Sequence, residues 1–374
     1  MEIQAAVLHT VGAPRPYAAS RPIRIETLRL DPPGPGEVLV KVDAAGLCHS
    51  DLSVINGDRP RPVPMALGHE AAGTVQEVGR DVHDLKPGDK VVMVFVPSCG
   101  HCAPCAEGRP ALCEPGVAAN MSGTLLSGER RLHMGGAPVN HHLGVSAFAT
   151  HAVVSRRSLV KVDPDVPAEV AALFGCAVLT GVGAVVNTAA LKPGTTAAVI
   201  GLGGVGLAAL LGALMAGAER VVAIDLLEGK RRQALALGAT DAFDGADADC
   251  VEQVRAATRG GVDYAFEMAG SAKALDLAYK ITRRGGTTVT AGLAHPAATL
   301  PLSPTSLVAE ERTLKGSYVG SCVPTRDLPR YMAMMRRGRL PVDRLLSGTL
   351  PLSDINAGFD RLDGGEALRQ VVVF

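Results

Sequence analysis

Four cysteines fall within 15 consecutive residues, at Cys99, Cys102, Cys105 and Cys113. Glycine and proline interrupt this run, which predicts a compact loop, residues 97–116, that can surround one metal ion. Zinc suits four thiolates best, because it binds them tetrahedrally at about 2.3 Å and has no geometric preference of its own. With eight cysteines and no recognisable secretory signal, metal ligands are favoured over disulfides. The run therefore predicts a closed, structural zinc site.

Three further candidate ligands, Cys48, His69 and Cys176, are scattered along the chain. Two thiolates neutralise Zn²⁺, and three protein ligands leave a fourth position open for water or an alcohol oxygen. An alcohol bound there loses its proton near neutral pH, as zinc-bound water does near pH 7, and can then give a hydride to a nicotinamide. Taken alone, Cys48 and Cys176 are better explained as buried structural thiols. The prediction of a catalytic zinc therefore depends on the rest of the sequence.

A glycine-rich motif of the form G-x-G-x-x-G occupies residues 201–206. It follows an apolar, strand-like run and opens a helix-length segment, so its glycines would let a pyrophosphate approach the N-terminus of a helix. Asp225 ends the next apolar run, 19 residues after Gly206. A carboxylate there would accept hydrogen bonds from the adenosine ribose and repel a 2′-phosphate. The motif predicts NAD in preference to NADP, and the alternative is a packing turn with an incidental Asp225.

Two architectures are needed to position these residues. The first 160 residues contain short alternating segments separated by Gly/Pro turns, which predict a β-rich domain with strands at residues 37–43, 72–78 and 89–95. From about residue 179, strand-length and helix-length segments alternate, which predicts an open parallel sheet wound with helices. The expected strands there are 197–200, 220–224, 263–267, 287–291 and 314–319, and the helices are 208–216, 228–237 and 272–281. A further helix is expected at 328–337, and the tail is expected to return to the first domain.

The length and composition of the chain limit the number of domains and the kinds of binding partner that we expect. A chain of 374 residues fits two domains. Lys+Arg and Asp+Glu both total 37, so we expect neither a nucleic acid nor an anionic membrane as a partner. Residues 170–191 and 195–218 are long enough to span a membrane, but the second stretch carries six glycines and is typical of a strand followed by a packed helix. Because the N-terminus lacks the features of a signal peptide, a cytoplasmic location is expected.

In combination, these motifs resemble those of the zinc-dependent medium-chain alcohol dehydrogenases, in the long-chain branch of the liver-type and class III (glutathione-dependent formaldehyde) enzymes. The resemblance spans essentially the whole chain and is carried by Gly-His-Glu-Ala-Ala-Gly at 68–73, the four-cysteine run, the glycine motif and Asp225. It implies an α/β fold with a GroES-like catalytic domain (1–178 and 321–374) and a Rossmann domain (179–320). It also implies reversible hydride transfer between a primary or aromatic alcohol and NAD, with two zinc ions per chain. The insertion at 116–141 favours a homodimer, joined through the strand at 314–319.

The resemblance also assigns roles to individual residues. Catalytic zinc would bind Cys48, His69 and Cys176, and structural zinc the four-cysteine run. Ser50 would take the alcohol proton, Asp51 would hold the ring of His69, Glu70 could approach the metal, and His49 would assist. The implied cofactor-binding positions are His49, Thr180, Gly201, Gly203, Gly204, Val205, Gly206, Asp225, Lys230 and Arg369. The implied substrate pocket comprises Phe95, His142, Leu143, Leu293 and Tyr318.

The sequence departs from the family pattern at several positions. His142 stands where liver-type enzymes have an aromatic residue, which indicates either a more polar substrate or a ring that only packs against the pocket wall. Ser53 replaces the histidine that ends the proton relay, so the relay must end differently. No basic residue follows Cys113, and Arg59 and Arg61 replace an acidic pair. These changes disfavour a glutathione adduct.

Two other functions stay open at this point. A thiol-dependent formaldehyde dehydrogenase, with a mycothiol-type or glutathione-type adduct as substrate, would use the same scaffold. A zinc-ribbon-like binding module is a third interpretation, which the zero net charge and the dinucleotide motif disfavour.

Overall fold

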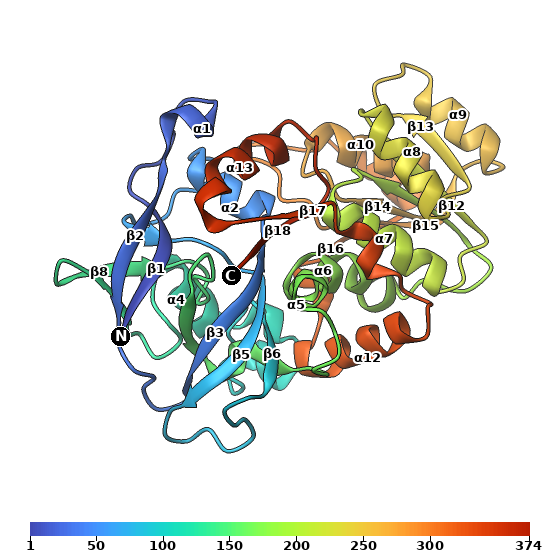
Figure 1. Cartoon of the computed structure of the whole chain (residues 1–374). Helices are drawn as coiled ribbons and strands as arrows, with labels where there is room; N and C mark the ends of the chain where they lie inside the picture. The colour runs from blue at the N-terminus through green and yellow to red at the C-terminus, as the bar shows by residue number, and fades with distance from the viewer. The chain divides into compact units, whose positions relative to one another are not determined.

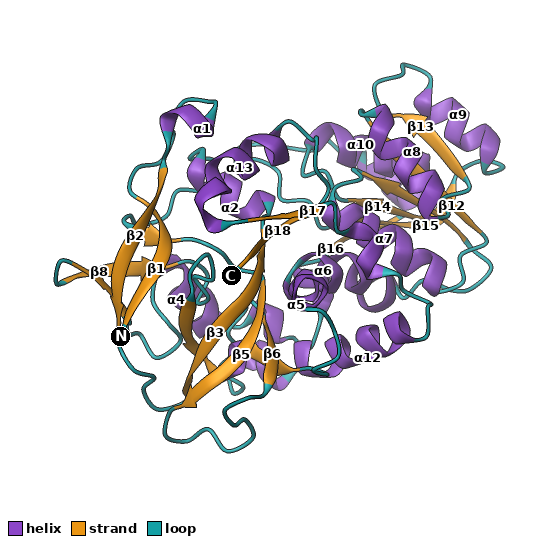
Figure 2. Cartoon of the chain, viewed as in Figure 1, coloured by secondary structure: helices purple, strands orange, loops and turns teal.

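Three sheets organise the chain, which the computed structural model describes from residue 1 to residue 374 (Figures 1 and 2). The first unit comprises Met1–Cys176, Val323–Pro329 and Leu346–Phe374, and the second comprises Ala177–Cys322 and Arg330–Leu345. The second unit thus begins at Ala177 instead of residue 179. It also includes Arg330–Leu345, which the sequence placed in the first domain. In that segment, Arg344 donates a hydrogen bond to the carbonyl oxygen of Ala236, at 2.7 Å, and so ties it to the second unit.

The first unit contains a closed barrel and a seven-stranded sheet. The barrel strands, in spatial order, are β1 (Glu2–Leu8), β2 (Ile23–Leu30), β7 (Leu132–Met134), β8 (Ala137–His141) and β4 (Met65–Ala66). The sheet runs β10 (Leu159–Lys161), β6 (Lys90–Met93), β5 (Ala71–Val78), β3 (Glu37–Gly46), β18 (Gln370–Val373) and β17 (Gly348–Leu350), and β9 (His151–Ser155) pairs with β3. Its helices are α1 (Tyr17–Ser20), α2 (His49–Ile55), α3 (Ala103–Ala106), α4 (Glu114–Ser122), α5 (Ala168–Ala172) and α13 (Ile355–Asp363).

The C-terminal tail returns to the first unit, as predicted. β18 pairs antiparallel with β3, and Val371 lies opposite Gly46. β18 also pairs in parallel with β17, and its Val371 and Val372 are fully buried. The tail therefore places Arg369 directly beside the end of β3, where α2 begins.

The second unit is a six-stranded sheet in which every neighbouring pair is parallel. Its order is β13 (Asp241–Asp244), β12 (Arg220–Asp225), β11 (Thr196–Ile200), β14 (Val262–Glu267), β15 (Thr282–Thr290) and β16 (Thr313–Gly316). The connecting helices include α7 (Gly204–Met215), α8 (Glu228–Leu237), α9 (Cys250–Ala257) and α10 (Ala272–Ile281). The strand order reverses between β11 and β14, and such a switch point is where doubly wound folds bind dinucleotides. The predicted α/β fold class is confirmed.

Several predicted elements need correction. β13 and α9 were not predicted, because they are short, with four and eight residues. α7 begins at Gly204 and not at residue 208, since the glycine motif itself forms its first turn. β16 ends at Gly316 and not at residue 319, because Val319 and Ser321 adopt a left-handed backbone (φ 50° and 49°) that a strand cannot accommodate. α12 (Pro324–Arg336) covers most of the helix expected at 328–337.

No single helix is both long and apolar enough to cross a membrane; one bent pair, Ala168–Gly175 with Ala177–Ala189, meets the criteria of length and composition only when taken together.

Candidate active site

Cys48, His69 and Cys176 converge within the first unit, together with Glu70. Their ligand atoms all lie within 4.8 Å of one another, and all four side chains are buried. Cys48 directly precedes α2, Glu70 directly precedes β5, and Cys176 follows the short helical turn Leu173–Gly175. The fold therefore brings three distant segments to one point.

The local backbone explains how His69 reaches this point. Gly68 has a φ of +96°, and a Cβ there would lie 2.4 Å from the backbone nitrogen of Phe148. Only glycine fits such a close approach in a left-handed conformation. Gly68 thus lets the chain turn against the 147–148 segment, so that His69 and Glu70 enter the buried site.

The donor set fits a zinc ion. His69 Nε2 is buried and has no hydrogen-bond partner in the protein, which is costly unless another group binds it. Two thiols and one imidazole are ligands that zinc prefers, and Zn²⁺ would bind that nitrogen. The neighbouring Cys176, with further contributions from Arg369 and His69, lowers the pKa of the Cys48 thiol well below its usual value, against the opposing effect of burial. This favours the thiolate that a metal requires.

Glu70 and Arg369 form a buried pair beside the candidate ligands. Arg369 Nη2 donates to Glu70 Oε2 at 3.0 Å, and Nη1 donates to the carbonyl oxygen of Leu47 at 2.9 Å. Burial raises the pKa of Glu70 to about 7, although the Arg369 guanidinium opposes that shift. The sequence interpretation placed Arg369 at the pyrophosphate; here both its Nη atoms bind groups of the first unit, and its contact with a cofactor stays a prediction.

Asp51 lies at the centre of a second buried cluster. Its Oδ2 lies 3.0 Å from His69 Nδ1, and its Oδ1 lies 3.0 Å from His142 Nδ1 and accepts a hydrogen bond from the backbone N–H of Gly68 at 3.2 Å. Neither imidazole contact has the alignment of a geometric hydrogen bond, although both distances are short. Burial alone would raise the pKa of Asp51, but His69 and His142 together lower it. The Asp51–His69 contact was expected, whereas the contact with His142 was not.

The other predicted residues of the first unit lie around these clusters. Ser50 Oγ lies 3.8 Å from Cys48 Sγ, and His49 begins α2 on its exposed side. The ring of Phe95 meets that of His69 edge to face, with centroids 5.2 Å apart. Ser53 donates a hydrogen bond to the carbonyl oxygen of Ser50 at 2.9 Å. Leu143 is buried next to His142 in the chain.

The four-cysteine run also converges. The sulfur atoms of Cys99, Cys102, Cys105 and Cys113 lie within 4.8 Å of one another. The backbone N–H groups of His101 and Cys102 donate to Cys99 Sγ, and those of Cys99 and Gly116 donate to Cys113 Sγ. The amide of His101 is the main reason that the pKa of Cys99 falls to about 6. N–H donors stabilise the thiolate of Cys99, and four sulfur atoms this close together fit a tetrahedral zinc. The side chain of His101 is exposed.

The glycine motif has the geometry of a dinucleotide site. Gly201 directly follows β11 and has a φ of +88°, and a Cβ on Gly206 would lie 1.8 Å from the carbonyl oxygen of Gly201. Gly203, which caps α7, has nothing within 4 Å of its Cβ position, so the backbone there is open to a ligand. Asp225 ends β12 and accepts hydrogen bonds from the backbone N–H groups of Leu202 and Leu227, at 2.7 and 2.9 Å. These observations fit a pyrophosphate at the helix N-terminus and a ribose beside Asp225.

The remaining predicted positions also belong to the second unit. Thr180 is buried in α6 (Ala177–Gly183), and Lys230 lies half-buried on α8. Leu293 and Tyr318 are exposed, at 54% and 37% of their full surface. Their contributions to cofactor binding or to a substrate pocket stay predictions.

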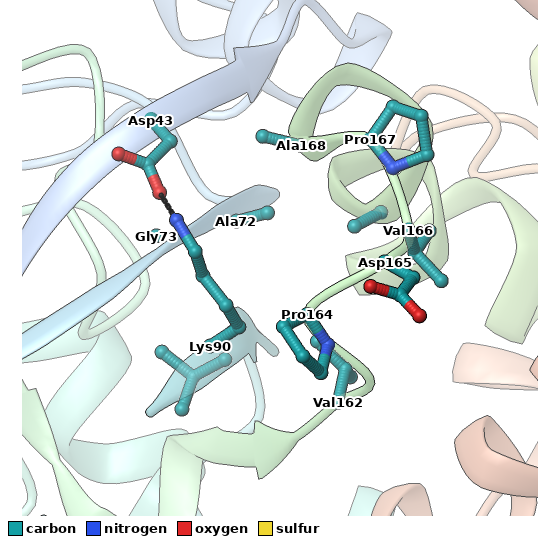
Figure 3. A pocket seen from close by; sticks show the side chains of 12 residues that line it. Asp43, Ala72, Gly73, Lys90, Val162, Pro164, Asp165, Val166, Pro167 and Ala168 are labelled. Carbon is teal, nitrogen blue, oxygen red and sulfur yellow. Dashed lines mark hydrogen bonds and ion pairs between the residues drawn. The ribbon is translucent and has the colours of Figure 1, made fainter. Parts of the chain in front are cut away.

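A cavity of about 220 Å³ in the first unit contains none of the predicted site residues (Figure 3). It lies between Gly73, the ion pair of Lys90 with Asp43, and the turn at residues 162–168. Thr74 shares the ion pair, donating to Asp43 and accepting from Lys90, so these two charges are already compensated. The chemistry therefore points to the thiol–imidazole cluster and away from this cavity.

His141, the neighbour of His142, predicts an acid-dependent loss of stability. Its Nε2 accepts a hydrogen bond from the backbone N–H of Arg131, and burial, assisted by Arg130 and Arg131, lowers its pKa to about 3. The unfolded chain binds a proton there below about pH 6.5, so this contribution is complete above that pH and is lost as the pH falls towards 3. At pH 5 the part already lost amounts to about 2 kcal/mol. We expect His141→Gln to reduce the difference in urea-unfolding free energy between pH 7.5 and pH 5 by about that amount, and an unchanged difference would contradict this explanation.

Comparison with known proteins relates both units to alcohol dehydrogenases. Residues 34–164 match the alcohol dehydrogenase GroES-like domain family, and residues 204–337 match the zinc-binding dehydrogenase family. The chain is 42% identical over 361 residues to a putative alcohol dehydrogenase D of Mycobacterium tuberculosis, covering 96% of this chain and 98% of that protein. It is 39% identical over 377 residues to an NDMA-dependent alcohol dehydrogenase of Amycolatopsis methanolica, covering 100% and 99%.

A solved structure agrees with these relatives. Benzyl alcohol dehydrogenase of Acinetobacter calcoaceticus matches with a TM-score of 0.93 at 32% identity, covering 100% of this chain and 99% of that chain. Both the fold and the convergent thiol–imidazole cluster are thus accounted for by a single family. The chain belongs to the zinc-dependent medium-chain alcohol dehydrogenases.

Proposed function

We propose that this alcohol dehydrogenase oxidises primary or aromatic alcohols with NAD, reversibly, at a zinc ion held by Cys48, His69 and Cys176. One observation carries the proposal: two thiols and an imidazole with an unpartnered Nε2 meet in a buried site. The same chain has a parallel sheet whose switch point carries the glycine motif. A second zinc ion in the four-cysteine loop would stabilise the fold and take no part in the reaction.

Each residue of the site has a separate role in the proposed reaction. When bound, zinc supplies a Lewis acid that makes an alcohol more acidic, and the nicotinamide supplies the hydride acceptor. Asp51 orients the imidazole of His69 through its close contact with Nδ1 and so leaves Nε2 for the metal. Ser50, whose hydroxyl lies beside Cys48, takes the proton of the alcohol. Ser53 already donates to the carbonyl oxygen of Ser50 and is not a base near pH 7, so the proton leaves by way of His49, a ribose hydroxyl and water.

Asp225 supports NAD over NADP. Its carboxylate would accept hydrogen bonds from the ribose hydroxyls and repel a 2′-phosphate. Arg231, the cation beside it, donates to the carbonyl oxygens of Asp225 and Leu226 and pairs with Asp244 at 2.9 Å. That guanidinium is therefore already engaged and compensated, and does not offer a free charge for a phosphate.

Substitution of Asp225 tests the cofactor preference. Asp225→Asn keeps the shape and one acceptor oxygen but removes the charge. Because charged hydrogen bonds contribute about 1.5–3 kcal/mol, the ratio of kcat/KM for NAD to that for NADP should fall about 10- to 100-fold. The matched control is Asp276→Asn. Asp276 forms an exposed ion pair with Lys280 on a helix of the same unit, so its substitution should leave the ratio unchanged. An unchanged ratio in the Asp225 variant would remove the basis for proposing NAD.

Free alcohols are proposed as substrates, and the alternative is a thiol adduct of formaldehyde. The similarity to benzyl alcohol dehydrogenase supports an aromatic alcohol as substrate. The thiol adduct stays an alternative because Arg61, half-buried near His142, could bind polar groups of such an adduct. The test is aldehyde formation from benzyl alcohol and an alkanol series, against NADH formation from formaldehyde with and without glutathione or mycothiol. Because one relative is NDMA-dependent, NAD, NADP and NDMA are compared as acceptors for the alcohols. Turnover of the thiol–formaldehyde mixture alone would establish the alternative.

The edge strand β16 supports a homodimer. It pairs only with β15 in the six-stranded sheet, so its outer backbone groups are available to a second copy of the chain. We place the enzyme in the cytoplasm, where its eight free cysteines would stay reduced for metal binding.

A further inference from the structure

His142 and His69 share a single buried carboxylate. Asp51 Oδ2 lies 3.0 Å from His69 Nδ1, and Asp51 Oδ1 lies 3.0 Å from His142 Nδ1. All three side chains are at least 98% buried. The two rings are close enough to interact directly, with centroids 5.6 Å apart and planes at 84°. The zinc-binding cluster is therefore linked to the loop after β8 through one carboxylate.

The distances determine which ring nitrogens carry protons. A nitrogen 3.0 Å from an ionised carboxylate oxygen must carry a proton, because otherwise two lone pairs would face each other. His69 and His142 are therefore both protonated at Nδ1. That leaves His69 Nε2 as the lone-pair nitrogen available to zinc.

Three N–H groups, of His69, His142 and the Gly68 backbone, together fix the orientation of the Asp51 carboxylate. Oδ1 lies 3.0 Å from His142 Nδ1 in an ion-pair contact and accepts a hydrogen bond from the backbone N–H of Gly68, whereas Oδ2 faces His69 alone. Without the N–H of His142, a buried carboxylate oxygen would keep a single donor, the Gly68 amide at 3.2 Å. Such an under-satisfied group is free to rotate towards another donor, and rotation would move Oδ2 away from His69.

The backbone around His142 is built to hold it in place. The backbone N–H of His142 donates to Ser146 Oγ at 2.9 Å. Leu143, Gly144 and Ser146 all have a left-handed backbone, with φ of 52°, 67° and 53°. Left-handed conformations cost energy in residues other than glycine and persist where the surrounding structure requires them. The tight loop therefore holds the ring of His142 against Asp51.

We propose that His142 is a positioning residue of the zinc centre: its Nδ1–H holds the Asp51 carboxylate so that the other oxygen fixes the ring of His69. The inference rests on the proposed zinc site of Cys48, His69 and Cys176 and adds to it a residue from a separate loop. It differs from a purely packing role, in which any ring of this size would serve. It differs also from a contact with substrate, which would use the other ring nitrogen, Nε2.

Three substitutions separate these roles. His142→Phe keeps a ring of similar size and removes both nitrogens. His142→Asn places an amide N–H near the position of Nδ1, whereas His142→Gln places one near the position of Nε2. His141→Gln, at the adjacent buried histidine that does not contact Asp51, is the matched control.

The measurement is zinc release from the holoenzyme into the chromogenic chelator 4-(2-pyridylazo)resorcinol under native conditions. Cys48→Ala identifies the phase that belongs to the catalytic site, since only that phase should disappear. Residues that orient a metal ligand typically contribute 10- to 100-fold in metal affinity. We therefore expect about 10-fold faster release in this phase for the Phe and Gln variants. The Asn variant and the His141→Gln control should release zinc at the wild-type rate.

The visible spectrum of the Co²⁺-substituted enzyme gives an independent readout. The ligand-field bands should shift in the Phe and Gln variants and coincide with the wild type in the Asn variant. Release at the wild-type rate in the Phe variant, or equally fast release in the Asn and Phe variants, would overturn the inference. If the Phe variant does not fold, the comparison of Asn with Gln decides the question alone. If Cys48→Ala removes no phase of zinc release that the wild type shows, the proposed zinc site itself is wrong. That outcome is distinct from a failure of the inference about His142.

Discussion

Cys48→Ala is expected to lower kcat for benzyl alcohol at least about 1,000-fold, while NAD affinity changes by less than about twofold. The alanine removes one of two thiolates from a site where three protein ligands are the minimum for a catalytic zinc. His69 and Cys176 alone would not hold the ion in place. The glycine motif and Asp225 belong to the second unit and keep their own contacts, so binding of the dinucleotide should persist.

The kinetics and the affinity for NAD are measured on the same sample, the latter by isothermal titration calorimetry. Cys250→Ala is the control, because Cys250 is a buried thiol of the second unit outside both cysteine clusters. It should change neither quantity beyond a modest loss of stability. Retained turnover in Cys48→Ala protein that contains no zinc at this site would exclude the proposed mechanism.

Cys113→Ser is expected to have the largest effect on stability. Cys113 is fully buried, and its sulfur accepts two backbone N–H groups, so its loss would disturb both the metal site and the loop. A serine hydroxyl is a poor zinc ligand, and structural zinc contributes directly to folding free energy. We expect a loss of about 4 kcal/mol, or about 5 °C in Tm for a chain of this size.

Zinc content distinguishes this effect from simple cavity formation. It should fall from two ions per chain to one in Cys113→Ser, and the remaining ion should still support turnover at low temperature. His101→Ala is the control within the same loop, because that side chain is exposed and is not needed as a ligand. Two zinc ions retained in the serine variant would contradict the assignment of Cys113 as a ligand.

Much of the fold was predictable because its signals are local. The glycine motif is bracketed by two apolar strands, and turn residues separate the strands of the first unit. These patterns depend on residues adjacent in the chain. The boundaries of β16 and of the second unit were less accurate, because they depend on the left-handed backbone at residues 319–321 and on long-range contacts such as that of Arg344 with Ala236. Neither leaves a periodic trace in the sequence.

In the candidate site, too, local sequence signals were predictable and long-range contacts were not. The four-cysteine run predicted its metal site directly through its spacing, whereas Cys48, His69 and Cys176 were predicted as ligands only through the resemblance to the family. The contact of His142 with Asp51 was not predicted, because the two residues lie on separate elements and either could have been an ordinary buried group. Nor did the sequence indicate that Arg369 binds Glu70, since opposite charges 299 positions apart carry no pattern. Only the three-dimensional arrangement identifies such pairs.

We propose that alcohol oxidation depends on zinc held by Cys48, His69 and Cys176. The most direct test measures zinc content and the rate of aldehyde formation from benzyl alcohol, with the acceptor that supports turnover, in one sample. Both quantities are followed during removal of zinc by a chelator and after zinc is added back. We predict that the rate falls in proportion to the loss of the first ion per chain and returns when it is restored. An unchanged rate in protein from which both ions have been removed would contradict the account.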